Sequence, residues 1–425
     1  MSRPGGSGRR ERHRGPTVAG FCELSCGTPR REPRDCPLSQ GPGPPGRAMG
    51  RVSMRYEVIR SRDQWQALRD EWNPLLAASR ADHLFMTWEW LDSWLQVQQS
   101  ITDLLIICVR GPAGELLGVA PFYRAEYRLL RLWRYRALRI IGDVDSGAEY
   151  QTWIARAADE DSVGAVIVQA LSKLRGEWDL IWMPMIGSWS GAHDPVVRAL
   201  QDGRVGVRSR PRGFSAVPLP TDYDTFLAGM SANRRQQLRR TTRKILSQPG
   251  VEVRQVATAA ELATALLSLF QLHGKRWRSV GQPGVFDRNG REREFYERFT
   301  PVALERGWLA MFTLADNGEH KAVQIGYVYR GVLLQLQEGF DPDYSPHVGN
   351  ALRAWVIQDC IRQGLREYDF LGGHSEHKRR WLAVERTGMD LLGFCPGYRG
   401  LPLRIGVWPT GAYLRPVEAR VAEPR

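Results

Sequence analysis

Long apolar runs are missing from this sequence, and no stretch approaches the roughly 18 uncharged apolar residues of a membrane-spanning helix. Cysteine is scarce, with six among 425 residues, and their scattered spacing does not suggest a disulfide framework. Lysine supplies only five of the 59 basic side chains, so the net charge of +13 comes mainly from arginine along the whole chain. These shortages favour a soluble, cytoplasmic protein and exclude a membrane-spanning or disulfide-rich secreted one. We attribute the arginine bias to genome composition rather than to a nucleic-acid partner.

The remaining composition is that of a globular protein, with 43% hydrophobic and 25% charged residues. A chain of this length favours two domains. Residues 1–53 are rich in Gly, Pro and Arg without apolar periodicity, which predicts a disordered tail. We expect domains over residues 54–213 and 214–400, followed by a C-terminal extension over residues 401–425.

An internal repeat begins at the first strand-like run and has a period near 200 residues. A strand is expected at 56–59, followed by the capping box Ser61-x-x-Gln64 and an amphipathic helix. A second strand is expected at 251–253, followed by the capping box Thr258-x-x-Glu261 and another helix. Each half continues with a short second helix, around 88–95 and 294–299.

Each half then shows a hairpin, a third strand, a long helix and a buried strand. The hairpin turns contain Gly114 and Gly318, the latter in an Asn-Gly pair that tolerates positive φ. The buried strands are expected at 178–182 and 367–371, with Asp179 and Asp369 as matching landmarks. The shared order predicts an α/β (α+β) fold of two similar units, each with a mixed central sheet flanked by helices.

The second half also carries a set of specific motifs. They are Leu272-His273-x-x-Arg276-Trp277, Gly284-x-Phe286, Gly339-Phe340-Asp341-Pro342-x-Tyr344-Ser345-Pro346, Glu367-Tyr368-Asp369-Phe370-Leu371-Gly372-Gly373 and Lys378-x-x-Trp381. This pattern resembles the CelD-like GNAT acetyltransferase family associated with polysaccharide biosynthesis. The position before Lys378, usually tyrosine in that family, is His377 here.

The resemblance implies two tandem GNAT-like units, packed edge to edge with the acceptor in the cleft between them. It also implies transfer of an acyl group, most simply acetyl, from acyl-CoA to an amine or hydroxyl. The acceptor would be a small molecule or a glycan- or lipid-linked group in polysaccharide or cell-envelope biosynthesis. The tandem architecture is also that of the Fem-type ligases, which add amino acids to peptidoglycan precursors.

In GNAT enzymes a glycine-containing loop at a helix start wraps the pyrophosphate of coenzyme A, where free N–H groups and the helix dipole favour an anion. The corresponding cofactor-binding residues here are expected to be His347, Val348, Gly349, Asn350 and Ala351. Gly349 has no Cβ, so we expect the phosphates to approach its backbone. The first half carries three acids at this point, residues 159–161, so the second half is the predicted cofactor site.

The expected chemistry is direct transfer assisted by a carboxylate base. Asp369, on the strand after the cofactor helix, and Glu338, on the preceding strand, are the two candidates. Either could instead be structural, Asp369 by holding the turn that follows it. Arg276, Trp277 and Lys378 are the expected acceptor-binding residues, and no metal site is expected, because His374 and His377 have no third partner.

One helix is expected from 223 to 246, with a basic arc that includes Arg239 and Arg243. This arc is either a solvated face or a site for a phosphate-bearing acceptor. Aromatic residues do not interleave with the bases, which argues against sequence-specific nucleic-acid binding.

Two alternatives to the acyl-CoA prediction stay open. A Fem-type ligase would use the basic helix for aminoacyl-tRNA and need no coenzyme A. A non-catalytic accessory protein of a polysaccharide synthesis complex would keep the fold without the activity.

Overall fold

The computed structural model of the protein describes residues 54–288 and 290–417, so the predicted tail, residues 1–53, lies outside the described residues. The first half contains, in order, β1 (Arg55–Ile59), α1 (Arg62–Gln66), α2 (Arg69–Ala77), η1 (Leu84–Met86), α3 (Trp88–Val97), β2 (Leu104–Arg110), β3 (Leu116–Leu129), β4 (Trp133–Ile140), β5 (Ile154–Ala155), α4 (Glu160–Lys173), β6 (Leu180–Ile186), α5 (His193–Asp202) and β7 (Gly206–Pro218). The second half contains α6 (Tyr223–Ala228), α7 (Ala232–Leu246), β8 (Val251–Gln255), α8 (Ala259–Ser279), η2 (Val285–Asp287), α9 (Arg291–Glu305), β9 (Leu309–Asp316), β10 (Glu319–Tyr329), β11 (Val332–Phe340), α10 (Val348–Arg362), β12 (Glu367–Gly372), α11 (Glu376–Arg379), β13 (Val384–Phe394), η3 (Tyr398–Gly400), α12 (Leu401–Ile405) and β14 (Leu414–Pro416).

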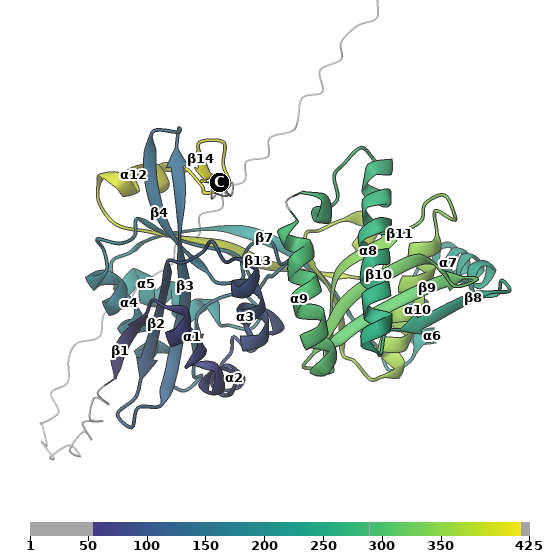
Figure 1. Cartoon of the computed structure of the whole chain (residues 1–425), viewed down its shortest axis with the longest axis horizontal. Helices are drawn as coiled ribbons and strands as arrows, with labels where there is room; N and C mark the ends of the chain where they lie inside the picture. The colour runs from purple at the N-terminus through teal and green to yellow at the C-terminus, as the bar shows by residue number, and fades with distance from the viewer. Residues whose placement is uncertain (1–53, 289, 418–425) are drawn as a thin grey trace, which may run out of the picture. The chain divides into compact units, whose positions relative to one another are not determined.

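The described strands form one 14-stranded mixed sheet that runs through both halves (Figure 1). Its order is β1-β2-β3-β4-β6-β13-β7-β12-β11-β10-β9-β8, with β5 and β14 attached to β3. Within each half the fourth and fifth main strands are parallel, β4 with β6 and β11 with β12, and the strands before them are antiparallel. The two units predicted from the sequence are therefore confirmed as a tandem α/β fold.

Local signals in the sequence account for the repeated elements. Ser61 and Thr258 each accept a hydrogen bond from the third residue of the helix that follows, and each completes a capping box. At the two hairpins, Gly114 has φ +89 and Gly318 has φ +82, while Asn317 has φ +49. These left-handed conformations are what the tight turns require.

The two halves exchange strands at their junction. β13 of the second half lies between β6 and β7, and β7 of the first half lies between β13 and β12. β7 pairs antiparallel with the full length of β13, from Val384 opposite Ala216 to Phe394 opposite Gly206. The domain boundary expected after residue 213 therefore falls inside β7, and each half is completed by a strand of the other.

β6 and β12 each contain a bulge, and the two bulges lie at equivalent positions of the two halves. The register of β6 shifts around Met185 and that of β12 around Leu371, and both residues have positive φ, +57 and +60. Matching the bulges places Asp369 inside its strand, two residues before the bulge residue, whereas Asp179 precedes the start of β6. The pairing of Asp179 with Asp369 expected from the sequence was therefore wrong, because similar short motifs were aligned several residues out of register.

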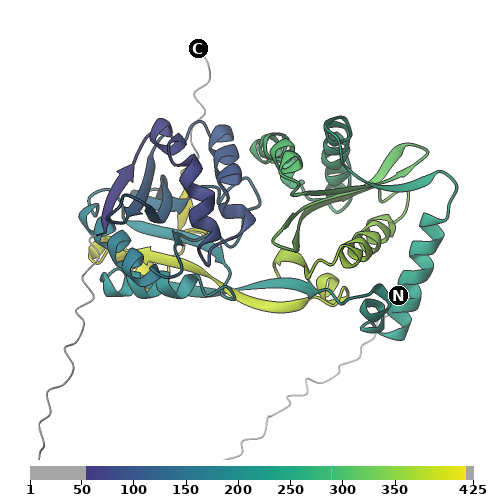
Figure 2. The same cartoon turned by 90° about the horizontal axis from the view of Figure 1, so that it is seen from below.

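Helices cover both faces of the second-half sheet (Figure 2). α8 and α9 pack on one face with the larger hydrophobic core, and α10 packs on the opposite face beside α7 in a separate core. The single helix expected over 223–246 is two helices, α6 and α7. The break falls at Gly229, and Ser231 caps the new helix by accepting from the backbone N–H of Arg234.

Candidate functional site

β11 and β12 separate partway along their length. Their parallel pairing ends at Leu334 opposite Asp369, whereas β11 continues to Phe340 and β12 to Gly372. β11 also bulges, since Gln335 and Gln337 pair with consecutive residues of β10 and leave Leu336 between them without a partner in that register. The end of the second-half sheet is thereby opened between these two strands.

Asp369 lies at the point where the strands separate and is buried. Its Oδ1 accepts from the backbone N–H of Leu371 at 2.7 Å, and the hydroxyl of Tyr150 donates to the carboxylate at 3.2 and 3.3 Å. Burial raises the pKa of the Asp369 carboxyl to about 6. Asp369 can therefore gain or lose a proton near neutral pH, as a general base must.

A second carboxylate, Glu149, approaches Asp369 from the first half. Its Oε2 is buried without a hydrogen-bond partner among the described residues. Burial, followed by the nearby charge of Asp369, raises the pKa of Glu149 to about 8. The two acids thus form a coupled pair contributed by both halves.

Lys378 closes the end of β12 beside this pair. Its Nζ donates to the carbonyl oxygens of four consecutive residues, 370–373. Burial lowers the pKa of Lys378, partly offset by the charges of Glu149 and Asp369. The ammonium group is turned toward the backbone rather than toward solvent, so the structure places it as a support for the β12 bulge.

Strained backbone gathers at the same place. Tyr150 has φ +62, its N–H donates to the carbonyl of Met185 at 2.8 Å, and Met185 and Leu371 are the two bulge residues with positive φ. Left-handed non-glycine residues are costly and concentrate at functional sites. Three of them around one buried carboxylate mark this cluster as a candidate active site.

Glu338 lies in the gap between β11 and β12 and is held by arginines from both faces. Its Oε1 accepts from Arg276 of α8 at 2.8 Å, and its Oε2 accepts from Arg353 of α10. Burial alone would raise the pKa of Glu338, but the charges of Arg353 and Arg276 outweigh it and keep the pKa below its usual value. An ionised, doubly paired carboxylate is a weaker base than Asp369, so the geometry favours Asp369 of the two candidates.

The motif residues around Glu338 have mostly structural contacts. His273 donates from Nδ1 to the carbonyl oxygen of Glu338 at 2.9 Å and accepts from the N–H of Val285 at 3.3 Å. Trp277 lies beside Arg276, whose guanidinium is 5.7 Å from the ring centroid. Arg276 is thus placed at the gap by its bond to Glu338, as an acceptor-binding residue would have to be, and Trp277 is its neighbour on α8.

The start of α10 carries the five expected cofactor residues. The N–H groups of His347 and Val348 bond to Ser345, and that of Ala351 bonds to His347. Those of Gly349 and Asn350 have no acceptor among the backbone bonds of the described residues. Two free N–H groups at the start of a 15-residue helix suit an anion.

Packing gives a further reason for glycine at position 349, beside the expected approach of a phosphate. A Cβ at Gly349 would lie 2.8 Å from the ring of Phe340 at the end of β11. The glycine is therefore required by packing between α10 and β11. A large residue at this position would disturb the fold, so Gly349 is unsuitable for testing ligand binding.

The basic arc lies on α7, where residues Arg235, Gln236, Arg239, Arg240, Arg243 and Lys244 line a shallow surface hollow. Leu238 and Ile245 are the buried residues of α7. Arg239 pairs with Asp224 at 2.8 Å, and Arg243 is exposed in the last turn, where a cation suits the helix dipole. Neither Asp369 nor Glu149 lines this hollow. The arc remains a candidate phosphate-binding face.

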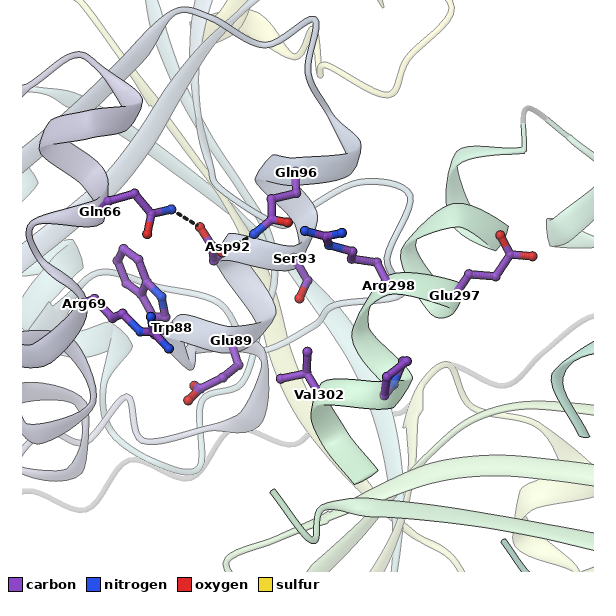
Figure 3. A pocket seen from close by; sticks show the side chains of 11 residues that line it. Gln66, Arg69, Trp88, Glu89, Asp92, Ser93, Gln96, Glu297, Arg298 and Val302 are labelled. Carbon is purple, nitrogen blue, oxygen red and sulfur yellow. Dashed lines mark hydrogen bonds between the residues drawn. The ribbon is translucent and has the colours of Figure 1, made fainter. Parts of the chain in front are cut away.

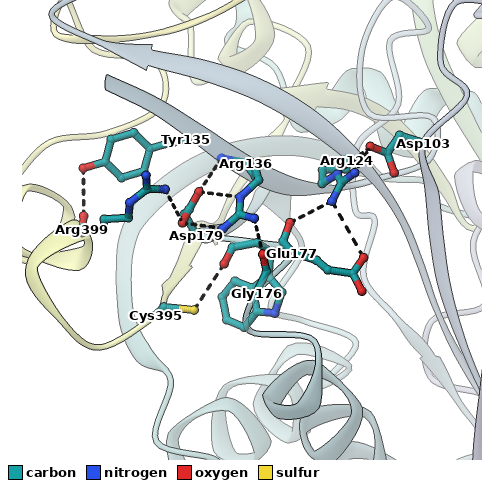
Figure 4. A network of polar contacts seen from close by, with 10 residues as sticks. Asp103, Arg124, Tyr135, Arg136, Gly176, Glu177, Asp179, Cys395 and Arg399 are labelled. Atoms are coloured by element: carbon teal, nitrogen blue, oxygen red, sulfur yellow. Dashed lines mark hydrogen bonds and ion pairs between the residues drawn. The ribbon is translucent and has the colours of Figure 1, made fainter. Parts of the chain in front are cut away.

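Asp179, the supposed counterpart of Asp369, is a structural ion-pair residue (Figure 4). It accepts from the side chain and backbone of Arg136 and from Arg399 at 2.9–3.1 Å. Burial would raise its pKa, but these hydrogen bonds outweigh burial and hold the pKa of Asp179 below its usual value.

A cavity of about 540 Å³ lies between α3 of the first half and α9 of the second (Figure 3). Its carboxylates already have partners: Asp92 accepts from Trp65 and Gln66, and Glu89 accepts from Asn73 and pairs with Arg306. Asp369 does not line it. The carboxylates of Glu89 and Asp92 that line the cavity are therefore satisfied by neighbouring side chains.

Sequence reasoning missed Glu149, Tyr150 and Arg353. Glu149 and Tyr150 lie on an irregular loop after β4, and no spacing links them to Asp369, 219 residues beyond Tyr150. Arg353 had a local signal, since an arginine at a buried position of a helix needs a partner, and Glu338 is that partner.

Within residues 54–288 and 290–417, no helix combines the length and apolarity needed to cross a lipid bilayer. In the same residues no group of three His, Cys, Asp or Glu side chains is arranged to hold a metal ion.

Comparisons with known proteins agree with this fold. Residues 232–379 match the family described as Acetyltransferase (GNAT) domain, which covers the opened sheet and the start of α10. A crystal structure of FemX superimposes with a TM-score of 0.51 at 11% identity, covering 76% of this chain and 95% of FemX. A tandem GNAT protein from the clavulanic acid biosynthesis pathway gives a TM-score of 0.42 at 12% identity, covering 81% of this chain and 100% of that protein. L-PGS from Bacillus licheniformis gives a TM-score of 0.43 at 15% identity, covering 75% of this chain and 94% of L-PGS. No curated protein gives a significant match to the sequence. The protein thus has a tandem α/β fold similar to that of FemX, and its second half contains a match to a GNAT domain.

Proposed function

We propose that the protein transfers an acyl group, most simply acetyl, from acyl-CoA to an amine or hydroxyl acceptor at the opening between β11 and β12. The observation that carries this proposal is the buried Asp369 carboxylate, with a raised pKa, at the point where the two strands separate. The match of residues 232–379 to a GNAT domain supports it.

Asp369 acts as the general base. With a pKa of about 6 it is ionised at neutral pH and can accept the proton that an ammonium or hydroxyl acceptor loses. Tyr150 holds the carboxylate through its hydroxyl, and the Leu371 N–H fixes one of its oxygens. Glu149, with a pKa of about 8, is mainly protonated at neutral pH, so Asp369 is the member of the pair that is ionised and can accept the proton.

Two sets of backbone N–H groups serve the acyl donor. Coenzyme A, when bound, presents the acyl group as a thioester. The free N–H groups of Gly349 and Asn350 would hold its pyrophosphate, with His347, Val348 and Ala351 forming the surrounding helix start. The N–H groups of β11 beyond Leu334 have no β12 partner, and those that do not bond to β10 are available to a developing oxyanion.

The acceptor is proposed to be a small molecule or a glycan- or lipid-linked group, as in polysaccharide or cell-envelope biosynthesis in the cytoplasm. Arg276 and Trp277 at the opening and the α7 arc with Arg239 and Arg243 are the basic and aromatic surfaces available to it. The arc contains no aromatic residue, which suits phosphate groups better than stacked bases.

A Fem-type ligase is the second candidate, favoured by the superposition with FemX and by the same α7 arc. Such an enzyme would take an aminoacyl group from tRNA and leave the α10 start empty of coenzyme A.

The test is a panel of amine and hydroxyl acceptors incubated with the full chain and acetyl-CoA, with release of the coenzyme A thiol as readout. We expect acceptor-dependent release whose kcat/KM rises with pH through about 6, as Asp369 ionises. No binding of acetyl-CoA, together with transfer from aminoacyl-tRNA to an amine, would reject this function in favour of the Fem-type one.

A further inference from the structure

Positive charge exceeds negative charge in the gap between β11 and β12. Arg276 and Arg353 both pair with Glu338, the carboxylate that lies between them. Arg234 of α7 adds a third guanidinium, 5.7 Å from the ring of Trp381, and Arg353 lies 5.5 Å from the same ring. Arg234 has no ion pair among the described residues, so the three guanidinium groups have one carboxylate partner and two positive charges are left without a counter-ion. Because Arg353 is only 2% exposed, water screens this surplus weakly.

Unpartnered hydrogen-bond donors surround the same place. Arg353 Nε, Arg234 Nε, Trp381 Nε1 and Trp277 Nε1 are buried and have no hydrogen-bond partner in the part of the chain that the structure describes. All four are donors, and a buried donor left unpaired costs about 1–3 kcal/mol. A ligand that supplies acceptor oxygens would pair these buried donors and also neutralise the excess positive charge.

His377 adds a further donor at the rim. Arg353 Nη1 donates to His377 Nε2 at 3.0 Å, so Nε2 is the unprotonated nitrogen and Nδ1 carries the proton. Burial, reinforced by the charges of Arg353, Arg276 and Arg234, lowers the pKa of His377 to about 4. The imidazole is therefore neutral and presents one N–H without adding charge.

We propose that Arg234, Arg276, Arg353, His377 and Trp381 form a binding site for an oxyanion, a carboxylate or a phosphate, of a ligand bound in the gap. The planar guanidinium groups can each offer two parallel N–H donors to such a group. Lys378 is not part of the site, because its ammonium group is occupied by the carbonyl oxygens of residues 370–373. The oxyanion belongs to the acceptor or to the acyl donor of the proposed transferase, so the inference rests on that function for its biological meaning.

The test uses inorganic phosphate, and acetate as a carboxylate, titrated into the full chain at constant ionic strength. Binding is followed by calorimetry and by the imidazole NMR signals of His377, which report this site and not the α7 arc. We expect saturable binding with a chemical-shift change at His377. Because no turnover is needed, the result does not depend on whether acyl transfer occurs.

Arg234→Gln is the main variant, since Arg234 has no ion pair with Glu338 and its loss leaves the Arg276–Glu338–Arg353 bridge intact. It should weaken phosphate binding at His377 by about tenfold, the loss of one charge-assisted contact. Arg366→Gln is the matched control, because it removes the same charge from an exposed residue at the opposite end of β12. It should change the affinity by less than about twofold, as expected for a distant screened charge.

Glu338→Gln provides a change in the opposite direction. It removes the counter-charge while keeping an oxygen that Arg276 and Arg353 can bond, so phosphate should bind about threefold or more tightly. A misfolded variant would not bind more tightly.

Saturation of the protein with coenzyme A before the phosphate titration distinguishes the two sources of the oxyanion, the acyl donor and the acceptor. Loss of phosphate binding assigns the site to the donor, and retained binding assigns it to the acceptor. Absence of saturable binding to the wild type, or equal weakening by Arg234→Gln and Arg366→Gln, would overturn the proposal.

Discussion

The two halves share a backbone plan but fill the space beside their bulged strands differently. In the first half, the loop after β4 lies against the β6 bulge, where the Tyr150 N–H bonds to the carbonyl of Met185. In the second half the corresponding gap holds the charged side chains of Glu338 and Arg353. The loop that fills the first gap also carries Glu149 and Tyr150 to Asp369. The loop of the first half thus supports the candidate active site of the second half.

The two buried aspartates express the same difference. Asp179 is held by arginines and its pKa is lowered, whereas Asp369 is held by a tyrosine and a backbone N–H and its pKa is raised. Ion pairing makes the first carboxylate a stabilising element, and burial with few compensating charges makes the second a reactive one. Substitution of each by asparagine should therefore give opposite results.

The largest expected effect is that of Asp369→Asn on activity. Loss of the general base should lower kcat by about 100-fold or more with little change in KM, measured with the acceptor found in the panel. The same substitution should make the folded protein more stable above pH 6. A carboxyl whose pKa rises from 3.8 to about 6 on folding stabilises the protein fully only below pH 3.8, and this contribution is lost as pH rises through 6.

Asp369→Asn should consequently raise the free energy of unfolding at pH 8 by up to about 3 kcal/mol, and by much less at pH 4. Urea denaturation at the two pH values measures the difference. An inactive variant that is also less stable at pH 8 would identify Asp369 as a structural residue.

Asp179→Asn should show the reverse behaviour. Its carboxylate contributes stability that is present above the unfolded pKa and lost as pH falls through the lower folded value. We expect a loss of about 1–3 kcal/mol at pH 7 that disappears in acid, with kcat unchanged. Reduced activity in a folded Asp179→Asn protein would break the contrast between the two aspartates.

The sequence predicted the repeat well and the site only in part. The capping boxes of Ser61 and Thr258 and the Asn317-Gly318 turn are local signals, so they were readable from neighbouring residues. Asp369 was found because its motif is local as well. Glu149 and Tyr150 were not, because their approach to Asp369 depends on strand exchange between the halves, a long-range pairing that no local pattern encodes.

The starts of α4 and α10 give a smaller contrast. His347→Glu places a negative charge at an exposed N-cap, where it suits the helix dipole but repels a pyrophosphate. We expect acetyl-CoA affinity to fall about tenfold by calorimetry, with the melting temperature unchanged or higher. Ser162→Glu, at the exposed first turn of α4, is the matched control and should leave the affinity unchanged. Equal loss in both variants would indicate a general charge effect.

The smallest effect is expected on α7. Replacing Arg239 and Arg243 with Gln should cost no more than about 0.5 kcal/mol each in urea denaturation, because both side chains are exposed. Binding of inorganic pyrophosphate should weaken and lose much of its salt dependence. An unchanged affinity and salt slope would show that the arc is a solvated face.

The most direct test of the divergence between the halves is amide hydrogen exchange of the full chain with and without acetyl-CoA. If the second half alone holds the donor, exchange should slow at Gly349 and Asn350 and along β11 beyond Leu334, while the start of α4 around Asp161 and Ser162 stays unchanged. Protection at the start of α4, or none at the start of α10 under saturating acetyl-CoA, would contradict the assignment of the second half as the catalytic one.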